Sequence, residues 1–139
     1  MISFNYESAF IIENETIFSD WLTNVILSEN KKEGDINYIF CDDGFLLDIN
    51  QKYLNHDTLT DIISFDYSIG NELHGDIFIS VERVQENAED FNVTFEDELK
   101  RVMAHGILHY CGYKDKTVED EKTMRCKEDE KMKLFHVKQ

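Results

Sequence analysis

The stretch between Thr94 and Gly112 constrains the fold of this chain more than any other part of the sequence. It opens with a capping-box pattern, in which Asp97 follows the N-cap residue Thr94 by three positions. The apolar residues that come next recur at helical spacing, namely Leu99, Val102, Met103, Ile107 and Leu108. Gly112 can take the left-handed conformation that commonly ends a helix. The pattern therefore predicts a central helix.

Shorter patterns around this helix predict a small sheet and further helices. Runs suited to strands cover residues 36–41, 60–67 and 73–80, and the turn chemistry of Gly70 and Asn71 joins the last two runs as a hairpin. Helices are expected over residues 16–29, with Gly34 closing that segment, over 42–53, over 81–91, and from Thr117 toward Phe135. The predicted class is α+β, with a partly antiparallel sheet covered by about five helices.

Composition favours one soluble domain over residues 1–139. The chain is 42% apolar and 12% aromatic, so it can form a hydrophobic core without disulfide support. No apolar run approaches the roughly 20 residues of a membrane span. The N-terminal residues lack a basic region, and Glu7 interrupts the stretch where a signal peptide would be apolar. Three cysteines without a C-x-x-C pair favour a reducing compartment, so we expect a cytoplasmic protein.

Two histidines on the central helix and a carboxylate after it are typical of a metal site. His105 and His109 lie on one helix face, with Cβ atoms about 5–6 Å apart, so both imidazoles can reach one ion. After Gly112 the chain can turn back and bring Asp115 to the same point. These three ligands leave one position of a zinc-like ion open, as in catalytic sites. We expect one Zn²⁺ per chain, although nickel and cobalt share its ligand preference.

Three motifs of the sequence resemble those of the YbeY family of metal-dependent bacterial endoribonucleases. The first, His105-Gly-Ile-Leu-His109-Tyr-Cys-Gly112-Tyr113-Lys-Asp115, is similar to the family's H-G-x-L-H-x-x-G-Y-D-H. The second consists of Asn50-Gln-Lys-Tyr53, Asp57 and Thr60-Asp-Ile-Ile-Ser-Phe65, and is similar to N-x-x-Y…D…T-D-V-L-S-F. The third, Gly75-Asp-Ile-Phe-Ile-Ser80, resembles the family's G-D-I-x-I-S strand.

The resemblance implies both a fold and an activity. The implied fold has a four-stranded sheet and a zincin-like metal helix, in which the histidine pair and the following loop bind zinc. The implied activity is cleavage of single-stranded RNA during ribosomal RNA maturation and small-subunit ribosome biogenesis. Ribosomal RNA, and the ribosome or factors associated with it, are then the expected partners.

Two positions depart from the family pattern. Asp115 stands where the family usually has a third histidine ligand, so the ligand set becomes two histidines and a carboxylate, which is an ordinary zinc ligand. Leu54 stands where the family carries an arginine that is thought to serve RNA cleavage. Lys52 and Arg83 are candidates for the missing positive group on sequence proximity alone. The sequence identifies no catalytic general base.

The distribution of charge indicates where RNA would bind. The net charge of −15 is unfavourable for phosphate binding. However, residues 1–99 hold 4 basic and 22 acidic side chains, whereas residues 100–139 hold 10 basic and 7 acidic ones. We therefore expect RNA to lie against the C-terminal forty residues, with Lys100, Arg101, Lys114 and Lys116 as binding residues.

Two other functions fit parts of the sequence. Metzincin metalloproteases share the ligand spacing, but they need a glutamate directly after the first histidine as general base, and Gly106 occupies that position here. The other alternative is a non-catalytic ribosome-associated factor with a structural metal, which Leu54 and the charge of −15 favour. The main hypothesis is a metal-dependent endoribonuclease.

Overall fold

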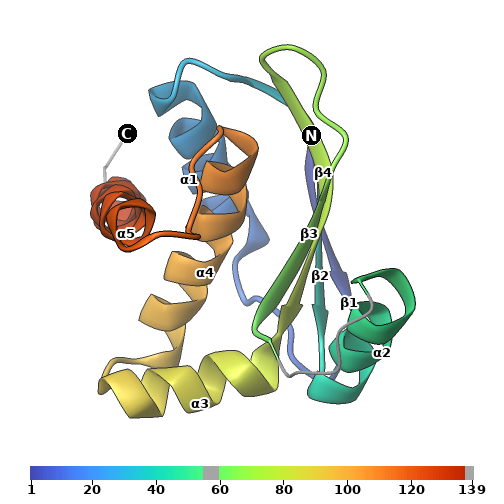
Figure 1. The fold of residues 1–139 in the computed structure, drawn as a ribbon. Coiled ribbons are helices and arrows are strands. Elements are labelled where there is room, and N and C mark those ends of the chain that lie inside the picture. The colour runs from blue at the N-terminus through green and yellow to red at the C-terminus, as the bar shows by residue number, and fades with distance from the viewer. Residues whose placement is uncertain (55–59, 137–139) are drawn as a thin grey trace.

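A computed structural model describes residues 1–54 and 60–136 and shows a four-stranded mixed sheet with helices on both faces (Figure 1). The elements follow in the order β1 (Ile2–Tyr6), α1 (Glu15–Ser28), β2 (Lys32–Cys41), α2 (Asp43–Leu54), β3 (Ile62–Asp66), β4 (Glu72–Ser80), α3 (Val81–Phe91), α4 (Phe95–Tyr110) and α5 (Val118–Lys133), with a final 3₁₀ turn (Leu134–His136). Five helices and four strands in the described part of the chain confirm the predicted α+β class. Asp57 of the second family-like motif lies outside the described residues.

The sheet combines parallel and antiparallel pairs in the order β1-β2-β4-β3. β2 is parallel to both of its neighbours, with Ile2 of β1 opposite Ile36. β3 is antiparallel to β4, with Ile63 opposite Phe78. The predicted hairpin is therefore confirmed.

The N-terminal part of the chain differs from the prediction in two ways. β1 is not among the predicted elements, although Ile2, Phe4 and Tyr6 alternate with polar residues in the manner of a half-buried strand. Gly34 does not close the first helical segment but lies within β2. α1 ends earlier, just before Asn30, whose φ of 58° supplies the left-handed conformation that we expected from glycine.

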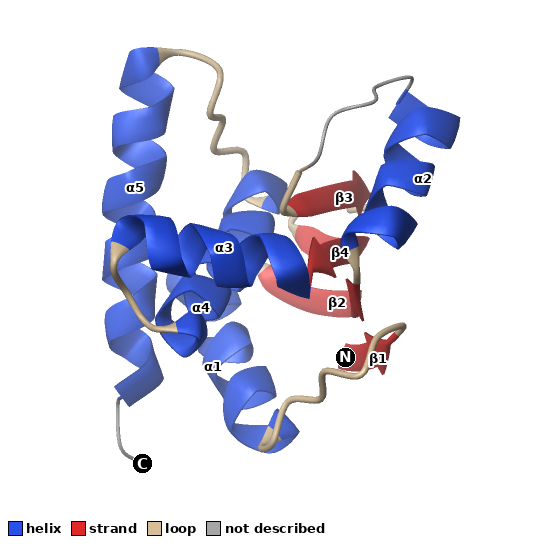
Figure 2. Ribbon diagram, turned by 90° about the horizontal axis from the view of Figure 1, so that it is seen from below, coloured by secondary structure: helices blue, strands red, loops and turns tan. Residues whose placement is uncertain are grey.

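The two faces of the sheet carry separate apolar cores. The larger core lies between the sheet and α1, α3 and α4, and takes from β4 the residues Leu73, Ile77 and Ile79. α2 covers the opposite face, where Leu46 packs with Ile63. Figure 2 shows α2 on one side of the strands and the other helices on the other side. No helix in the described residues combines the length and apolar character needed to cross a bilayer.

α4 packs closely on the sheet, and its two histidines line a cavity that residues of β3 also line. Gly106 is buried against the strands, and a Cβ atom at this position would lie 2.9 Å from Cδ1 of Ile77. One turn later the Tyr110 hydroxyl donates to the main-chain carbonyl of Phe65 over 2.9 Å. Position 106 therefore faces the sheet, and the glutamate that a metzincin mechanism needs has no room there.

α5 is joined to α1 through the buried side chain of Lys131. This side chain is 1% exposed, and its ammonium group lies 2.6 Å from Oε2 of Glu29 and 2.8 Å from Oγ of Ser28. The main-chain carbonyl of Lys131 accepts a hydrogen bond from the Trp21 indole over 2.8 Å. A buried ammonium is costly unless it keeps its counter-charge, so Glu29 is needed to hold α5 in place.

We expect Glu29→Gln to lower the free energy of unfolding by about 2 kcal/mol, because it leaves the Lys131 ammonium buried with too little negative charge around it. Glu130→Gln is the matched control. Glu130 also contacts Lys131, at 2.6 Å, but it is 55% exposed, so its loss should cost less than about 1 kcal/mol. Urea unfolding followed by Trp21 fluorescence measures both variants. Equal losses would contradict the role assigned to Glu29.

Candidate metal centre

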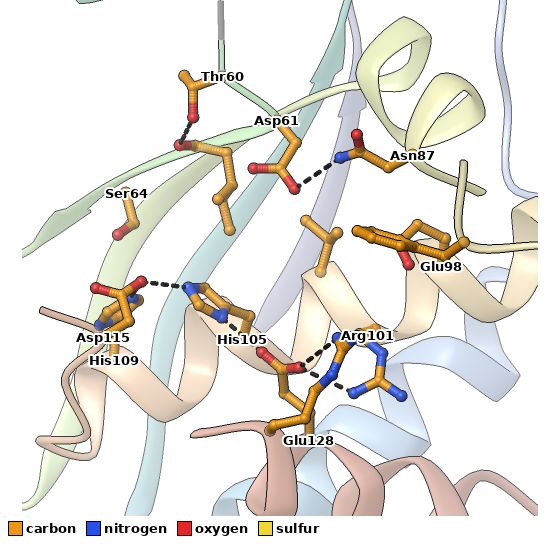
Figure 3. A pocket seen from close by; sticks show the side chains of 14 residues that line it. Thr60, Asp61, Ser64, Asn87, Glu98, Arg101, His105, His109, Asp115 and Glu128 are labelled. Atoms are coloured by element: carbon orange, nitrogen blue, oxygen red, sulfur yellow. Dashed lines mark hydrogen bonds and ion pairs between the residues drawn. The ribbon is translucent and has the colours of Figure 1, made fainter. Parts of the chain in front are cut away.

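The three predicted metal ligands come together at the C-terminal end of α4 (Figure 3). His105 and His109 lie one helical turn apart, with ring centroids separated by 4.4 Å. Asp115 lies in the connection between α4 and α5, and its Oδ2 is 3.2 Å from Nε2 of each histidine. One donor atom from each of the three residues lies within 4.8 Å of the others. Their side chains therefore converge on one point.

The connection after α4 returns Asp115 to the histidines. Gly112 has a φ of +103°, a backbone conformation that favours glycine. α5 then begins at its own N-cap, Thr117, whose capping box is completed by Asp120. Asp115 therefore does not supply that cap, and its carboxylate faces the histidines instead.

Each histidine is held through the ring nitrogen that faces away from Asp115. Nδ1 of His105 lies 2.7 Å from Oε2 of Glu128 on α5, and this carboxylate is only 7% exposed. Nδ1 of His109 lies 3.0 Å from the main-chain carbonyl of Tyr113. Because both acceptors require a proton on Nδ1, the lone pair of each neutral ring is on Nε2, the nitrogen that faces Asp115. Metal-binding histidines are commonly oriented in this way.

The protonation of His105 opposes metal binding in acid. Burial disfavours the charged imidazole, but the hydrogen bond and negative charge of Glu128, together with the charge of Asp115, outweigh it and raise the pKa of His105. Protons therefore compete for His105 at a higher pH than for a solvent-exposed histidine.

The donor set fits a zinc-like divalent cation. Two neutral imidazole nitrogens and one carboxylate oxygen are ordinary zinc ligands, and three protein ligands leave a position for water or substrate. Oδ2 of Asp115 lies 3.2 Å from Nε2 of both histidines. All three side chains also line the adjacent cavity, so the site is open to it. A cation bound by His105, His109 and Asp115 would thus be accessible from that cavity.

The cavity beside the three ligands has a volume of about 420 Å³ and a mixed wall. β3 and the residues just before it contribute Asp61 and Ile62, α3 contributes Asn87 and Phe91, and α4 contributes Glu98. Figure 3 shows Asp61, Asn87 and Glu98 on the side of the cavity farther from Asp115. A ligand much larger than a water molecule can therefore reach the three metal-binding side chains.

Two arginines line the cavity, and they differ in how far other side chains already occupy their hydrogen-bond donors. Arg101 donates to Glu128 over 2.9 Å and to Asp129 over 2.6 Å, so its guanidinium is occupied by two carboxylates. Arg125 is 54% exposed, and its Nη1 lies 3.7 Å from Oε1 of Glu128, a longer ion-pair contact. Arg125 therefore retains donors that can bind an anionic ligand.

Comparison with known proteins places these residues within a family. The family model described as Endoribonuclease YbeY matches residues 3–136, a range that includes all three candidate ligands. The chain belongs to the endoribonuclease YbeY family. The resemblance noted in the three sequence motifs is thereby confirmed.

Relatives and a solved structure agree with this assignment. A protein named endoribonuclease YbeY from Flavobacterium psychrophilum is 73% identical over 139 residues, which cover 100% of this chain and 99% of the relative. One with the same name from Flavobacterium johnsoniae is 69% identical and covers 100% of both chains. The solution structure of a Thermotoga maritima protein matches with a TM-score of 0.67 and 27% identity, over 97% of this chain and 89% of that chain.

The basic residues predicted to bind RNA are placed in three different environments. Lys114 and Lys116 are exposed on either side of Asp115. Arg101 lines the cavity in its paired state. Lys100 is only 3% exposed, with its ammonium 3.7 Å from the centre of the Phe135 ring and 3.1 Å from Glu96. Lys100 is therefore turned into the protein and does not line the cavity.

The candidates for the missing positive group also lie elsewhere. Arg83 pairs with Asp43 and Glu86, and Lys52 pairs with Asp48 on α2, and neither lines the cavity. Arg125, on α5, does line the same cavity as the metal ligands. The C-terminal cluster of basic residues was the only sequence signal for it.

We expect Asp115→Ala to weaken zinc binding by more than about 100-fold, since losing even a group that only supports a ligand costs about 10- to 100-fold. Asp115→His should keep the metal, because it restores three ligands of an ordinary zinc set. Equilibrium dialysis with metal analysis measures both, and circular dichroism checks that the helices are intact. If the alanine variant keeps a full complement of zinc, the three-ligand site is wrong.

Proposed function

We propose that the protein is a zinc-dependent endoribonuclease that cleaves single-stranded RNA in the cytoplasm, during maturation of ribosomal RNA for the small ribosomal subunit. One observation carries the proposal: Nε2 of His105 and of His109 face Oδ2 of Asp115 at the wall of an open cavity. Membership of the YbeY family and the names of the relatives support a nuclease. Ribosomal RNA, and the ribosome or its associated factors, are the proposed partners.

The roles of the side chains follow from their contacts. A bound zinc ion would lower the pKa of a water ligand toward about 7 and polarise a phosphoryl oxygen. His105 and His109 would hold it as neutral imidazoles, and Asp115 as a carboxylate. Glu128 and the Tyr113 carbonyl keep the proton of each imidazole on Nδ1, which leaves Nε2 free to bind.

The positive group for the phosphodiester is assigned to Arg125. The family-like arginine position holds Leu54, which cannot stabilise the charge that develops on phosphate oxygens. Arg125 lines the same cavity as the metal ligands, and its side chain is mostly exposed. Its planar guanidinium can donate two hydrogen bonds to one phosphate group.

A non-catalytic ribosome-associated factor with a structural metal is the second candidate. The net charge of −15 and the apolar residue at position 54 favour it, because both weaken phosphate binding. A metalloprotease is less suitable, since Gly106 provides no proton acceptor and faces the sheet.

We expect the zinc-loaded protein to cleave single-stranded RNA but not casein, and a chelator to lower RNA cleavage by at least about 100-fold, because the three ligands alone supply no activated water. Added zinc should restore the activity, and Asp115→Ala should remain inactive. Gel analysis of labelled RNA measures the effect. Zinc binding without RNA cleavage would favour the non-catalytic factor, and chelator-sensitive casein cleavage would favour the protease.

We further expect the Lys114→Gln, Lys116→Gln double variant to bind single-stranded RNA more weakly and with less salt dependence. For single strands each lost phosphate contact lowers the log–log slope by about 0.7, so two contacts account for about 1.4. The control is Lys32→Gln, Lys52→Gln, which removes the same charge from lysines of β2 and α2 with side chains 72% and 67% exposed. Fluorescence anisotropy at several salt concentrations measures the slopes. Equal slopes for both variants would refute the placement of RNA beside Asp115.

A further inference from the structure

The end of the cavity that lies away from Asp115 contains the buried carboxyl group of Glu98. Glu98 on α4 is only 5% exposed and lines the cavity. No hydrogen bond or ion pair joins its side chain to any residue that the structure describes. Its carboxyl oxygens are nonetheless not sealed within the protein, since no fully buried side-chain oxygen in the described residues lacks a partner. They therefore face the cavity, where a ligand can reach them.

Asp61 provides a second carboxyl group in the same wall. Its Oδ2 accepts a long hydrogen bond of 3.4 Å from Nδ2 of Asn87, and its main-chain carbonyl accepts one of 2.9 Å from the amide of Ser80. Burial raises the pKa of Asp61, and burial together with the charge of Asp61 raises the pKa of Glu98. Burial therefore outweighs the stabilisation that Arg101 and Arg125 give to the charge of Glu98 and that His105 and two main-chain amides give to the charge of Asp61. A ligand with N–H donors would replace the interactions that burial removes.

The same part of the cavity has apolar walls. Phe91 at the end of α3 lines it with a side chain that is 55% exposed, and Ile62 and the buried Val102 line it as well. Flat aromatic ligands stack on such surfaces, and unpaired RNA bases are commonly bound by an aromatic ring together with hydrogen bonds to their edges. Arg125 lies beside this wall, with its guanidinium carbon 5.8 Å from the centre of the Phe91 ring. The phosphate of a nucleotide whose base is bound here would lie close enough to accept hydrogen bonds from the Arg125 guanidinium.

We propose that Asp61, Asn87, Glu98 and Phe91 form a nucleobase subsite that selects guanine in the RNA strand next to the cleaved phosphodiester. This inference rests on the proposed nuclease function. Guanine presents N1–H and the N2 amino group side by side, so it offers two donors to one carboxylate. Uracil presents one donor between two carbonyl oxygens, and adenine and cytosine present one amino group beside an acceptor nitrogen. A carboxylate therefore pairs best with guanine. The guanidinium groups of Arg101 and Arg125 along the same cavity make a second cation less suitable at this end.

The first test measures binding of mononucleotides to the full-length, zinc-loaded protein by isothermal titration calorimetry. We expect GMP to bind at least about 10-fold more tightly than AMP, CMP or UMP, because the other bases each lose a hydrogen bond to a charged acceptor. Inosine monophosphate, which keeps N1–H but lacks the amino group, should bind with intermediate affinity. Affinities within twofold for all five nucleotides would overturn the proposal.

Variants then locate the preference within the cavity. Glu98→Gln and Asp61→Asn should each reduce the ratio of GMP to AMP affinity to below about threefold. Asp90→Asn is the matched control, since it removes the same charge from an exposed residue of α3 outside the cavity. It should keep the wild-type ratio. A guanine preference that survives both cavity variants would overturn the assignment, and the wild-type measurement stands even if one variant fails to fold.

The test separates this inference from the function on which it rests. Cleavage of RNA oligonucleotides that differ only in one base is measured alongside the binding. Cleavage without a guanine preference in either assay would leave the nuclease function intact and overturn the subsite. A preference for GMP without any RNA cleavage would support the subsite and overturn the nuclease function.

Discussion

The nearly buried carboxylate of Glu128 joins the packing of the helices to the geometry of the candidate metal centre. A carboxylate removed from water needs charged hydrogen-bond partners, and Glu128 has Nη1 of Arg101 and Nδ1 of His105. Both partners belong to α4, whereas Glu128 belongs to α5. Satisfying this one carboxylate therefore sets how the two helices lie against each other. The same contact fixes the orientation of the His105 ring, so helix packing and ligand geometry cannot be changed independently.

The sequence predicts the parts of the site that are encoded locally. His105, His109 and Asp115 lie within a short segment, where helical periodicity and one glycine turn fix their relative positions. Asp61 and Glu128 could not be found in this way, because they reach the site from other elements through tertiary packing. The same distinction applies to the fold. The β3–β4 hairpin carries a turn signal, whereas β1 pairs in parallel with a distant strand and has no such signal.

Electrostatic predictions from the sequence fail where burial redirects a side chain. Several basic residues of the last forty lie near the candidate ligands, but others are paired inside the protein. Lys100 lies against Phe135, Lys131 is neutralised by Glu29, and Arg101 is neutralised by two carboxylates. The exposed basic groups on this side are fewer: Lys114, Lys116, Lys122 and Arg125. Burial depends on the final packing. A count of basic residues in the sequence therefore overestimates the positive electrostatic potential that a phosphate would experience.

The position of α5 after the ligands in the chain has a consequence for biosynthesis. Translation proceeds from the N-terminus, so His105, His109 and Asp115 emerge before Glu128, which holds His105, and before Lys131, which attaches α5 to α1. At that stage the nascent chain contains every ligand but lacks one wall of the cavity. The candidate site is completed only when α5 docks, because α5 supplies Glu128 and Arg125 to the wall of the cavity. The proposed activity therefore requires a chain in which α5 has docked.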